Sequence, residues 1–275
     1  MNTMSLAIMS GKGGVGKSNL SLNLGYSLAQ KNHALLLMDC DLGLANLDVL
    51  LGITPEQNLQ DVLLSGADVK NAIISLEKNT KEAFDILPAA SGVPELTDMN
   101  SDMRDLLIKR INPSLRGYDI ILMDLGAGIH GTVQSFAAMA AIRIIVLTPE
   151  PTALTDAYAL IKVLSQDLGV RDFLVVVNDV ASRKEEEITF KRLEMACQKF
   201  LNINPVLLGG VRHDVKLQES VLRQKPLLDL FAESNSAQDI GTLADRILKI
   251  YARMEPHLEG QEPLRVLDKN KNFKA

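Results

Sequence analysis

The fold of this chain is decided by one segment near its start, Met4-Ser5-Leu6-Ala7-Ile8-Met9-Ser10-Gly11-Lys12-Gly13-Gly14-Val15-Gly16-Lys17-Ser18. It begins as a short apolar run, continues as a glycine-rich loop and leads into a helical pattern from about Asn19. Gly11, four further residues and then Gly16-Lys17-Ser18 fit the P-loop pattern, in which backbone N–H groups converge on phosphate oxygens. The segment therefore predicts a strand, a phosphate-binding loop and a helix whose N-terminus faces the anion.

The residues of this loop have distinct expected roles. Lys17 is expected to neutralise the β- and γ-phosphates, and the Ser18 hydroxyl is expected to reach Mg²⁺. A glycine turn that binds nothing is the alternative, and the strand before the loop and the helix after it disfavour it. The candidate nucleotide-binding residues are Gly11, Gly13, Gly14, Val15, Gly16, Lys17, Ser18 and Asn19.

Composition narrows the class of protein. The chain has 275 residues, of which 47% are hydrophobic, so it can bury a large core, and we expect one domain. A formal net charge of −5 argues against a globally basic nucleic-acid-binding protein. Cys40 and Cys197 are far apart and lack Cys-x-x-Cys spacing, which predicts neither a disulfide scaffold nor a cysteine-held metal. With no signal-peptide pattern and no apolar run of roughly 20 residues, a cytoplasmic protein is expected.

Short apolar runs alternate with segments of helical spacing along the chain. Because the runs lack polar alternation, they predict strands of a mainly parallel, twisted sheet with helices on both faces. A single α/β domain is expected over residues 1–255, and a tail over 256–275, after Pro and Gly interrupt the last helix. The predicted strands are 6–9, 34–38, 84–87, 120–123, 142–147, 173–177 and 206–208.

Three acidic residues follow two of these runs. Ligands of parallel sheets bind at the carboxyl ends of the strands, where Asp39 and Asp41 leave the second run and Asp124 ends the fourth. Carboxylates at this edge are suited to hold Mg²⁺ or to accept a proton from an attacking water. Capping of a helix or loop is the alternative role for Asp39 and Asp41.

Further residues carry a resemblance to a known family. Residues 12–18 resemble the deviant Walker A motif of the ParA/MinD family, residues 39–48 resemble its switch I, and residues 148–158 resemble the strand-to-helix turn of its FlhG (flagellar number) branch. The resemblance implies a P-loop NTPase of the MinD-like SIMIBI class that uses ATP and Mg²⁺.

The resemblance also implies roles for single residues. Lys12 would reach across a dimer to the partner's nucleotide, Asp41 would orient or deprotonate the attacking water, and Lys17 would complete the catalytic set. Ser18, Asp39 and Asp124 would hold the metal and its waters. The expected adenine-side residues are Asn178, Val211 and Arg212, with Arg183 as a weaker candidate.

Four residues outside these sets also carry expectations. His130 is expected to be a surface or capping residue and Glu150 to belong to the dimer surface, while Thr152 or Thr155 is expected to cap the helix that follows.

By this resemblance the chain is an ATP hydrolase of low intrinsic turnover, which dimerises with ATP and separates on hydrolysis. It would regulate the number or placement of a polar assembly, with the flagellum as the expected target. Its expected partners are a second copy, and an FlhF-like GTPase or a flagellar basal-body component. The alternative is a ParA-type partitioning ATPase that binds DNA non-specifically, although nucleic-acid binding is not expected from the charge. A disordered tail is the default, and contact of the tail with anionic lipid at the inner face of the cell membrane is the alternative.

Overall fold

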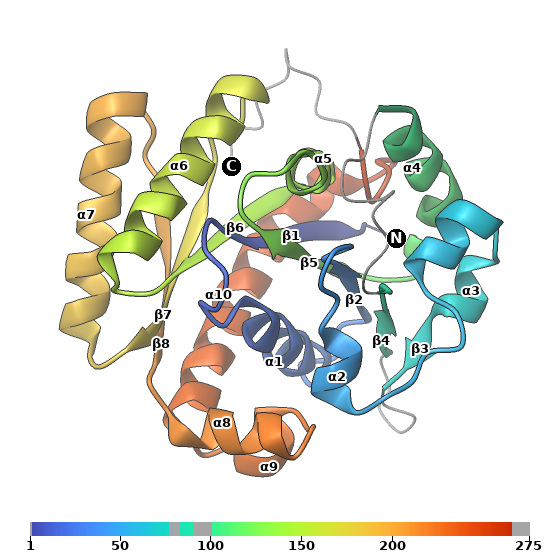
Figure 1. Cartoon of the computed structure of the whole chain (residues 1–275), viewed down its shortest axis with the longest axis horizontal. Helices are drawn as coiled ribbons and strands as arrows, with labels where there is room; N and C mark the ends of the chain where they lie inside the picture. The colour runs from blue at the N-terminus through green and yellow to red at the C-terminus, as the bar shows by residue number, and fades with distance from the viewer. Residues whose placement is uncertain (1, 77–82, 91–100, 266–275) are drawn as a thin grey trace.

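The computed structural model describes residues 2–76, 83–90 and 101–265, and its centre is a twisted sheet (Figure 1). The strand order is β3-β4-β2-β5-β1-β6-β7-β8, and every neighbouring pair is parallel except β3 with β4. The predicted fold class is therefore confirmed. The strands are β1 (Met4–Ser10), β2 (Leu35–Cys40), β3 (Ile74–Ser75), β4 (Phe84–Leu87), β5 (Ile120–Ala127), β6 (Ile142–Leu147), β7 (Leu174–Val180) and β8 (Val206–Arg212).

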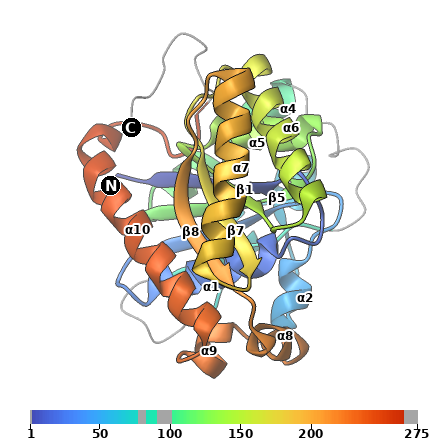
Figure 2. The same cartoon turned by 90° about the vertical axis from the view of Figure 1, so that its left-hand side faces the viewer.

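Helices cover both faces of the sheet. Helices α1 and α10 pack together on one face, and α6 and α7 pack together on the other, as Figures 1 and 2 show. The helical elements are α1 (Lys17–Ala29), α2 (Leu47–Leu51), the π-helical turn η1 (Asp61–Ser65), α3 (Val69–Ala72), α4 (Ser101–Leu115), α5 (Gly131–Met139), α6 (Pro151–Asp167), α7 (Arg183–Leu201), α8 (Val215–Leu222), α9 (Leu227–Phe231) and α10 (Asn235–Leu258). None of the helices within the described ranges is both long enough and apolar enough to cross a bilayer.

The central strands are apolar because helices cover them from both sides. All seven residues of β1 and all six of β2 are buried, so neither strand shows a solvent-facing alternation. The strand β1 lies between β5 and β6, in the middle of the sheet. The P-loop that follows β1 is thereby held at the centre of the sheet's carboxyl edge.

The end of the described chain docks against this domain. Helix α10 continues past Met254 to Leu258 with Pro256 in its last turn, whereas the sequence predicted an interruption there. Leu258 is buried and Leu264 is fully buried, which holds the last turn and the segment beyond it against the core. The boundary expected at residue 255 thus falls within a packed segment. Residues 266–275 of the expected tail lie outside the described residues.

Candidate functional site

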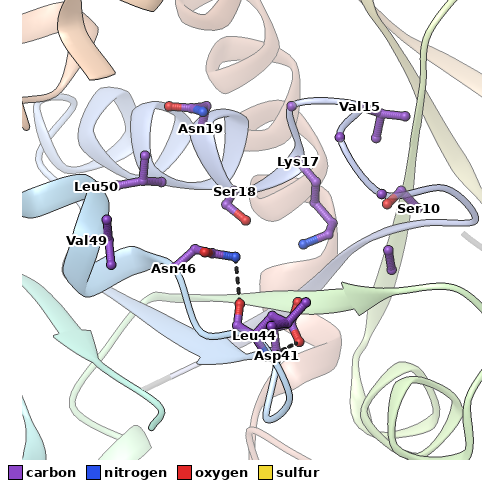
Figure 3. A pocket seen from close by; sticks show the side chains of 14 residues that line it. Ser10, Val15, Lys17, Ser18, Asn19, Asp41, Leu44, Asn46, Val49 and Leu50 are labelled. Carbon is purple, nitrogen blue, oxygen red and sulfur yellow. Dashed lines mark hydrogen bonds between the residues drawn. The ribbon is translucent and has the colours of Figure 1, made fainter. Parts of the chain in front are cut away.

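A cavity of about 410 Å³ opens at the carboxyl edge of the sheet, between the P-loop and the segment after β2 (Figure 3). The side chains of Lys17, Ser18 and Asp41 point toward it from three directions. The structure thus brings together most residues that the sequence predicted for the phosphate end of a nucleotide site. Those lining the cavity are Gly13, Gly14, Val15, Gly16, Lys17, Ser18, Asn19 and Asp41.

The P-loop is held in place by two close approaches that require glycine. Gly16 has a φ of 84°, in the left-handed region, and a Cβ added to it would lie 2.4 Å from Nδ2 of Asn178. That same Nδ2 donates a hydrogen bond to the carbonyl oxygen of Val15 at 2.8 Å. At the other end of the loop, a Cβ on Gly11 would lie 2.2 Å from the carbonyl oxygen of Asp156 in α6. The loop is therefore fixed between β7 and α6.

A buried ion pair lies below the loop. Lys17 Nζ donates to Asp124 Oδ1 at 3.0 Å, and the Ser21 hydroxyl donates to the same oxygen at 2.9 Å. Both charged side chains are almost fully buried. Lys17 begins α1, so the short path from loop to strand places its ammonium on the carboxylate that ends the apolar part of β5.

Asp39 lies opposite Asp124, since these two residues are partners in the parallel pairing of β2 with β5. Burial, followed by the negative charge of Asp124, raises the pKa of Asp39 to about 7. Its carboxylate accepts three backbone N–H groups, from Asp41 at 3.1 Å, Asn46 at 3.1 Å and Leu47 at 3.3 Å. The capping role that was the alternative for Asp39 is therefore present in the structure.

Asp41 lies at the rim of the cavity and is partly exposed. Its Oδ1 accepts the backbone N–H of Leu44 at 3.1 Å, which closes the turn after β2. A Cβ added to Gly126 would lie 3.2 Å from the same oxygen, so the carboxylate sits against the glycine backbone that ends β5. This placement leaves Asp41 beside the loop on which phosphates would lie.

The oxygen donors at this edge suit a magnesium ion that is bound mainly through phosphates and water. No cluster of three or more His, Cys, Asp or Glu side chains with metal-binding geometry occurs among the described residues. Mg²⁺ typically takes only one or two protein oxygens beside substrate phosphates and waters, and a hydroxyl with nearby carboxylates meets that need. The donor chemistry of Ser18, Asp39 and Asp124 thus fits Mg²⁺.

Lys12, unlike most other residues of the loop, does not line the cavity and instead contacts the start of α6. Its Nζ forms an ion pair with Oε2 of Glu150 and a hydrogen bond with Oγ1 of Thr152 at 3.0 Å. Glu150 occupies the N-cap position of α6 without a side-chain capping bond, and the Thr155 hydroxyl donates to the carbonyl of Pro151. The prediction that Thr152 or Thr155 caps α6 is therefore wrong, because Thr152 binds Lys12 and Thr155 bonds back within the helix.

The residues expected on the adenine side are divided between two places. Asn178 is buried against the P-loop, whereas the Arg212 guanidinium is bound to Asp239 of α10, at 2.7 Å from Nε and 2.9 Å from Nη2. The backbone N–H of Arg212 also donates to Asp239, at 3.0 Å. Val211 is buried in β8. The structure thus brings Asn178 to the loop and turns the Arg212 side chain toward α10.

Two more predicted positions are exposed. His130 lies at the N-cap position of α5 and makes no side-chain capping bond, and Arg183 opens α7 on the surface. The expected surface position of His130 agrees with this placement.

Sequence and structure comparisons identify relatives that match most of the chain. The family model for the CobQ/CobB/MinD/ParA nucleotide binding domain matches residues 6–227. The antiactivator FleN of Pseudomonas aeruginosa is 33% identical over 242 residues, covering 88% of this chain and 85% of that protein. The flagellum site-determining protein YlxH of Helicobacter pylori is 35% identical over 240 residues, covering 85% of this chain and 79% of that protein.

Solved structures with the same fold include two MinD proteins. The septum site-determining protein MinD of Pyrococcus horikoshii, complexed with Mg-ADP, superposes with a TM-score of 0.69 at 28% identity, covering 90% of this chain and 97% of that one. MinD in the MinC:MinD cell division complex of Aquifex aeolicus gives a TM-score of 0.71 at 27% identity, with coverage of 90% and 96%.

Proposed function

The chain belongs to the CobQ/CobB/MinD/ParA family of nucleotide-binding domains and is an ATP hydrolase, and from this premise we propose that it regulates the number or placement of flagella. One observation carries the chemistry: Lys17, Ser18 and Asp41 surround a single cavity below which Asp124 is buried. The flagellar role is supported by the similarity to FleN and YlxH, whose names describe an antiactivator and a flagellum site-determining protein.

In this proposal the chain's own groups bind ATP and place a water for attack. The P-loop amides and Lys17 bind the phosphates. To do so, the Lys17 ammonium leaves Asp124 and binds the β- and γ-phosphoryl oxygens instead. Ser18, Asp39 and Asp124 would hold Mg²⁺, and the bound ion would offset the negative charge that develops on the transferred phosphoryl group. The Asp41 carboxylate orients the attacking water or accepts its proton. Asn178 contacts the edge of the adenine base from the same position in which it hydrogen-bonds the P-loop at Val15.

We infer further that ATP joins two subunits across the cavity face and that hydrolysis separates them. Leu44 and Val49 line the cavity, yet these residues are 71% and 62% exposed. Ile129, which follows Gly126 by three residues, is 44% exposed. Large apolar side chains exposed beside a binding site are typical of a surface that another protein covers. A second copy is the proposed covering partner, and an FlhF-like GTPase or a flagellar basal-body component is the proposed downstream partner.

The proposed location is cytoplasmic, and the alternative is peripheral contact at the inner face of the cell membrane. Sedimentation with anionic vesicles in the presence of ATP tests this location. Sedimentation with DNA tests the partitioning alternative, which requires binding that weakens steeply as salt rises. The net charge of −5 acts against general electrostatic attraction to either anionic surface, so binding in either assay would require a local cluster of basic side chains.

The variant Asp41→Ala tests the catalytic proposal. It is expected to hydrolyse ATP at least about 100-fold more slowly, because a positioned base contributes that much or more, while it still binds ATP. Phosphate release and titration with a fluorescent ATP analogue measure the two properties. Asp245→Ala, which removes an exposed carboxylate on α10, is the matched control and should keep the unmodified rate. Equal hydrolysis by Asp41→Ala would disprove the assignment.

The switch and the flagellar role need separate measurements. Sedimentation velocity of Asp41→Ala should show dimers with ATP and monomers with ADP. Cells that lack their own FleN-type protein and produce this chain should recover a normal flagellar number, counted by electron microscopy. Cells producing Asp41→Ala should not recover it, because their subunits would stay paired.

A further inference from the structure

We propose that Glu150 and Thr152 hold Lys12 in a resting position within its own subunit, and that pairing of two subunits exchanges this contact for the partner's nucleotide. The inference rests on the proposed dimer switch and names two positioning residues for it. Its starting observation is that the Lys12 ammonium is bound by the first turn of α6 and does not line the cavity of its own subunit.

The backbone of Lys12 is fixed before its side chain begins. The Ser10 hydroxyl donates to the carbonyl oxygen of Lys12 at 2.9 Å. Gly11, the preceding residue, is pressed so closely on Asp156 that a side chain there would overlap the α6 backbone. Lys12 therefore leaves the loop within reach of the start of α6, and the contact with Glu150 and Thr152 follows from how loop and helix pack.

The start of α6 presents acceptors that have no competing role within the helix. Glu150 has extended backbone angles, φ −60° and ψ 136°, and its carboxylate makes no capping bond to α6. Pro151 follows at the first helical position, where its fixed φ sets the direction in which the helix begins. An ammonium has three N–H donors, so one carboxylate oxygen and one hydroxyl can both be satisfied by Lys12.

This resting contact is weak enough to be exchanged. The Lys12 and Glu150 side chains are 36% and 60% exposed. An exposed ion pair changes an equilibrium constant by a factor between one and about five. A two-fold symmetric dimer would break one such contact in each subunit, so the effect on dimerisation is the square of the effect on one subunit. A contribution of roughly threefold per subunit would raise the dimer dissociation constant about tenfold.

The resting position can be tested without any dimer. Lys12 in the nucleotide-free chain should react with acetyl N-hydroxysuccinimide about two- to threefold faster in Glu150→Gln, and slightly faster in Thr152→Ala, because a bound ammonium is less reactive. Peptide mass spectrometry would measure this rate against Lys191 in the same sample. Glu255→Gln is the matched control, since it also removes one exposed negative charge. Glu255 lies far from Lys12, because Tyr251 in the same part of α10 contacts Asn2 at the edge of the sheet opposite the P-loop. An unchanged Lys12 rate in Glu150→Gln would overturn the proposal.

The exchange is tested by pairing. With Asp41→Ala present in every variant to prevent turnover, Glu150→Gln should dimerise with ATP at about tenfold lower concentration. Weaker pairing of Glu150→Gln would overturn the exchange and would assign Glu150 to the dimer contact itself. If the unmodified chain formed no dimer with ATP, the proposed switch would fail, whereas the labelling result would still decide the resting contact.

Discussion

Lys17 Nζ lies 3.0 Å from Asp124 Oδ1, and the two side chains are only 8% and 2% exposed. This ammonium faces Asp124, while Asp39 lies opposite the same carboxylate on the neighbouring strand. The residue proposed to bind ATP phosphates thus also neutralises a buried acidic site. Stability and nucleotide binding therefore depend on one side chain.

Replacing Lys17 by alanine should consequently destabilise the folded chain as well as abolish ATP binding. Removing one partner of a buried ion pair leaves the other charge unpaired, which costs about 3 kcal/mol or more. Urea unfolding of Lys17→Ala without nucleotide measures this cost. Lys12→Ala, which breaks an exposed ion pair, is the control and should cost less than about 1 kcal/mol. Equal stabilities of the two variants would show that the buried pair contributes no more to stability than the exposed pair.

Gly16 should tolerate alanine less well than Gly14 does. Both residues have left-handed φ values, 84° and 81°, but an added Cβ meets Asn178 at Gly16 and meets nothing within 4 Å at Gly14. Gly14→Ala is expected to cost about 1 kcal/mol from backbone strain, and Gly16→Ala more, with weaker binding of a fluorescent ATP analogue.

A double variant identifies the cause of the Gly16 effect. If contact with the Asn178 amide causes the additional loss, Asn178→Ala in the Gly16→Ala background should restore part of the stability. Strictly additive losses would contradict that explanation, because residues in contact are expected to couple.

The sequence predicted the fold well where long apolar runs define buried strands. Seven strands were found in this way, but β3, with only Ile74 and Ser75, is too short to give a pattern. Loop spacing identified the P-loop cavity residues, since phosphate binding requires local backbone geometry. The sequence does not predict the contact of Lys12 with Glu150, because this contact depends on how α6 begins beside the loop, and a threonine such as Thr152 at the start of a helix is typical of a cap.

Two further differences arise from tertiary packing. Arg212 is expected on the adenine side, but Asp239, 27 residues later, binds its guanidinium. The proline and glycine residues after Met254 predicted the end of the domain, whereas burial of Leu264 continues it. Neither partner is visible in a local sequence pattern.

Cys197 should make stability depend on pH in alkaline solution. Burial in α7 raises the pKa of its thiol from 9.0 to about 11. The folded chain therefore keeps a proton that the unfolded chain loses, so this contribution to stability is complete below pH 9 and is lost as the pH rises toward 11. Over that interval, the free energy of unfolding should fall more steeply with pH than in Cys197→Ala, by up to about 1 kcal/mol per pH unit. Parallel curves from urea unfolding would contradict this.

Asn112 should be needed to hold the segment after α10. Its buried side chain donates to the Leu264 carbonyl at 2.9 Å and accepts the Leu264 N–H at 3.0 Å, while the Ser5 hydroxyl donates to the Pro263 carbonyl. Asn112→Ala leaves two buried backbone groups unpaired, so we expect a loss of about 2 to 4 kcal/mol in the free energy of unfolding.

Truncation provides the matching measurement. A chain ending at residue 255 should be less stable than one ending at residue 265, because it loses the burial of Leu258 and Leu264, at about 1.5 to 3 kcal/mol each. Asn112→Ala should then have little further effect in the chain ending at 255, because its partner is already absent. An undiminished effect there would mean that Asn112 stabilises the domain through something other than this segment, and equal stability of the two truncated chains would place the domain boundary at residue 255 after all.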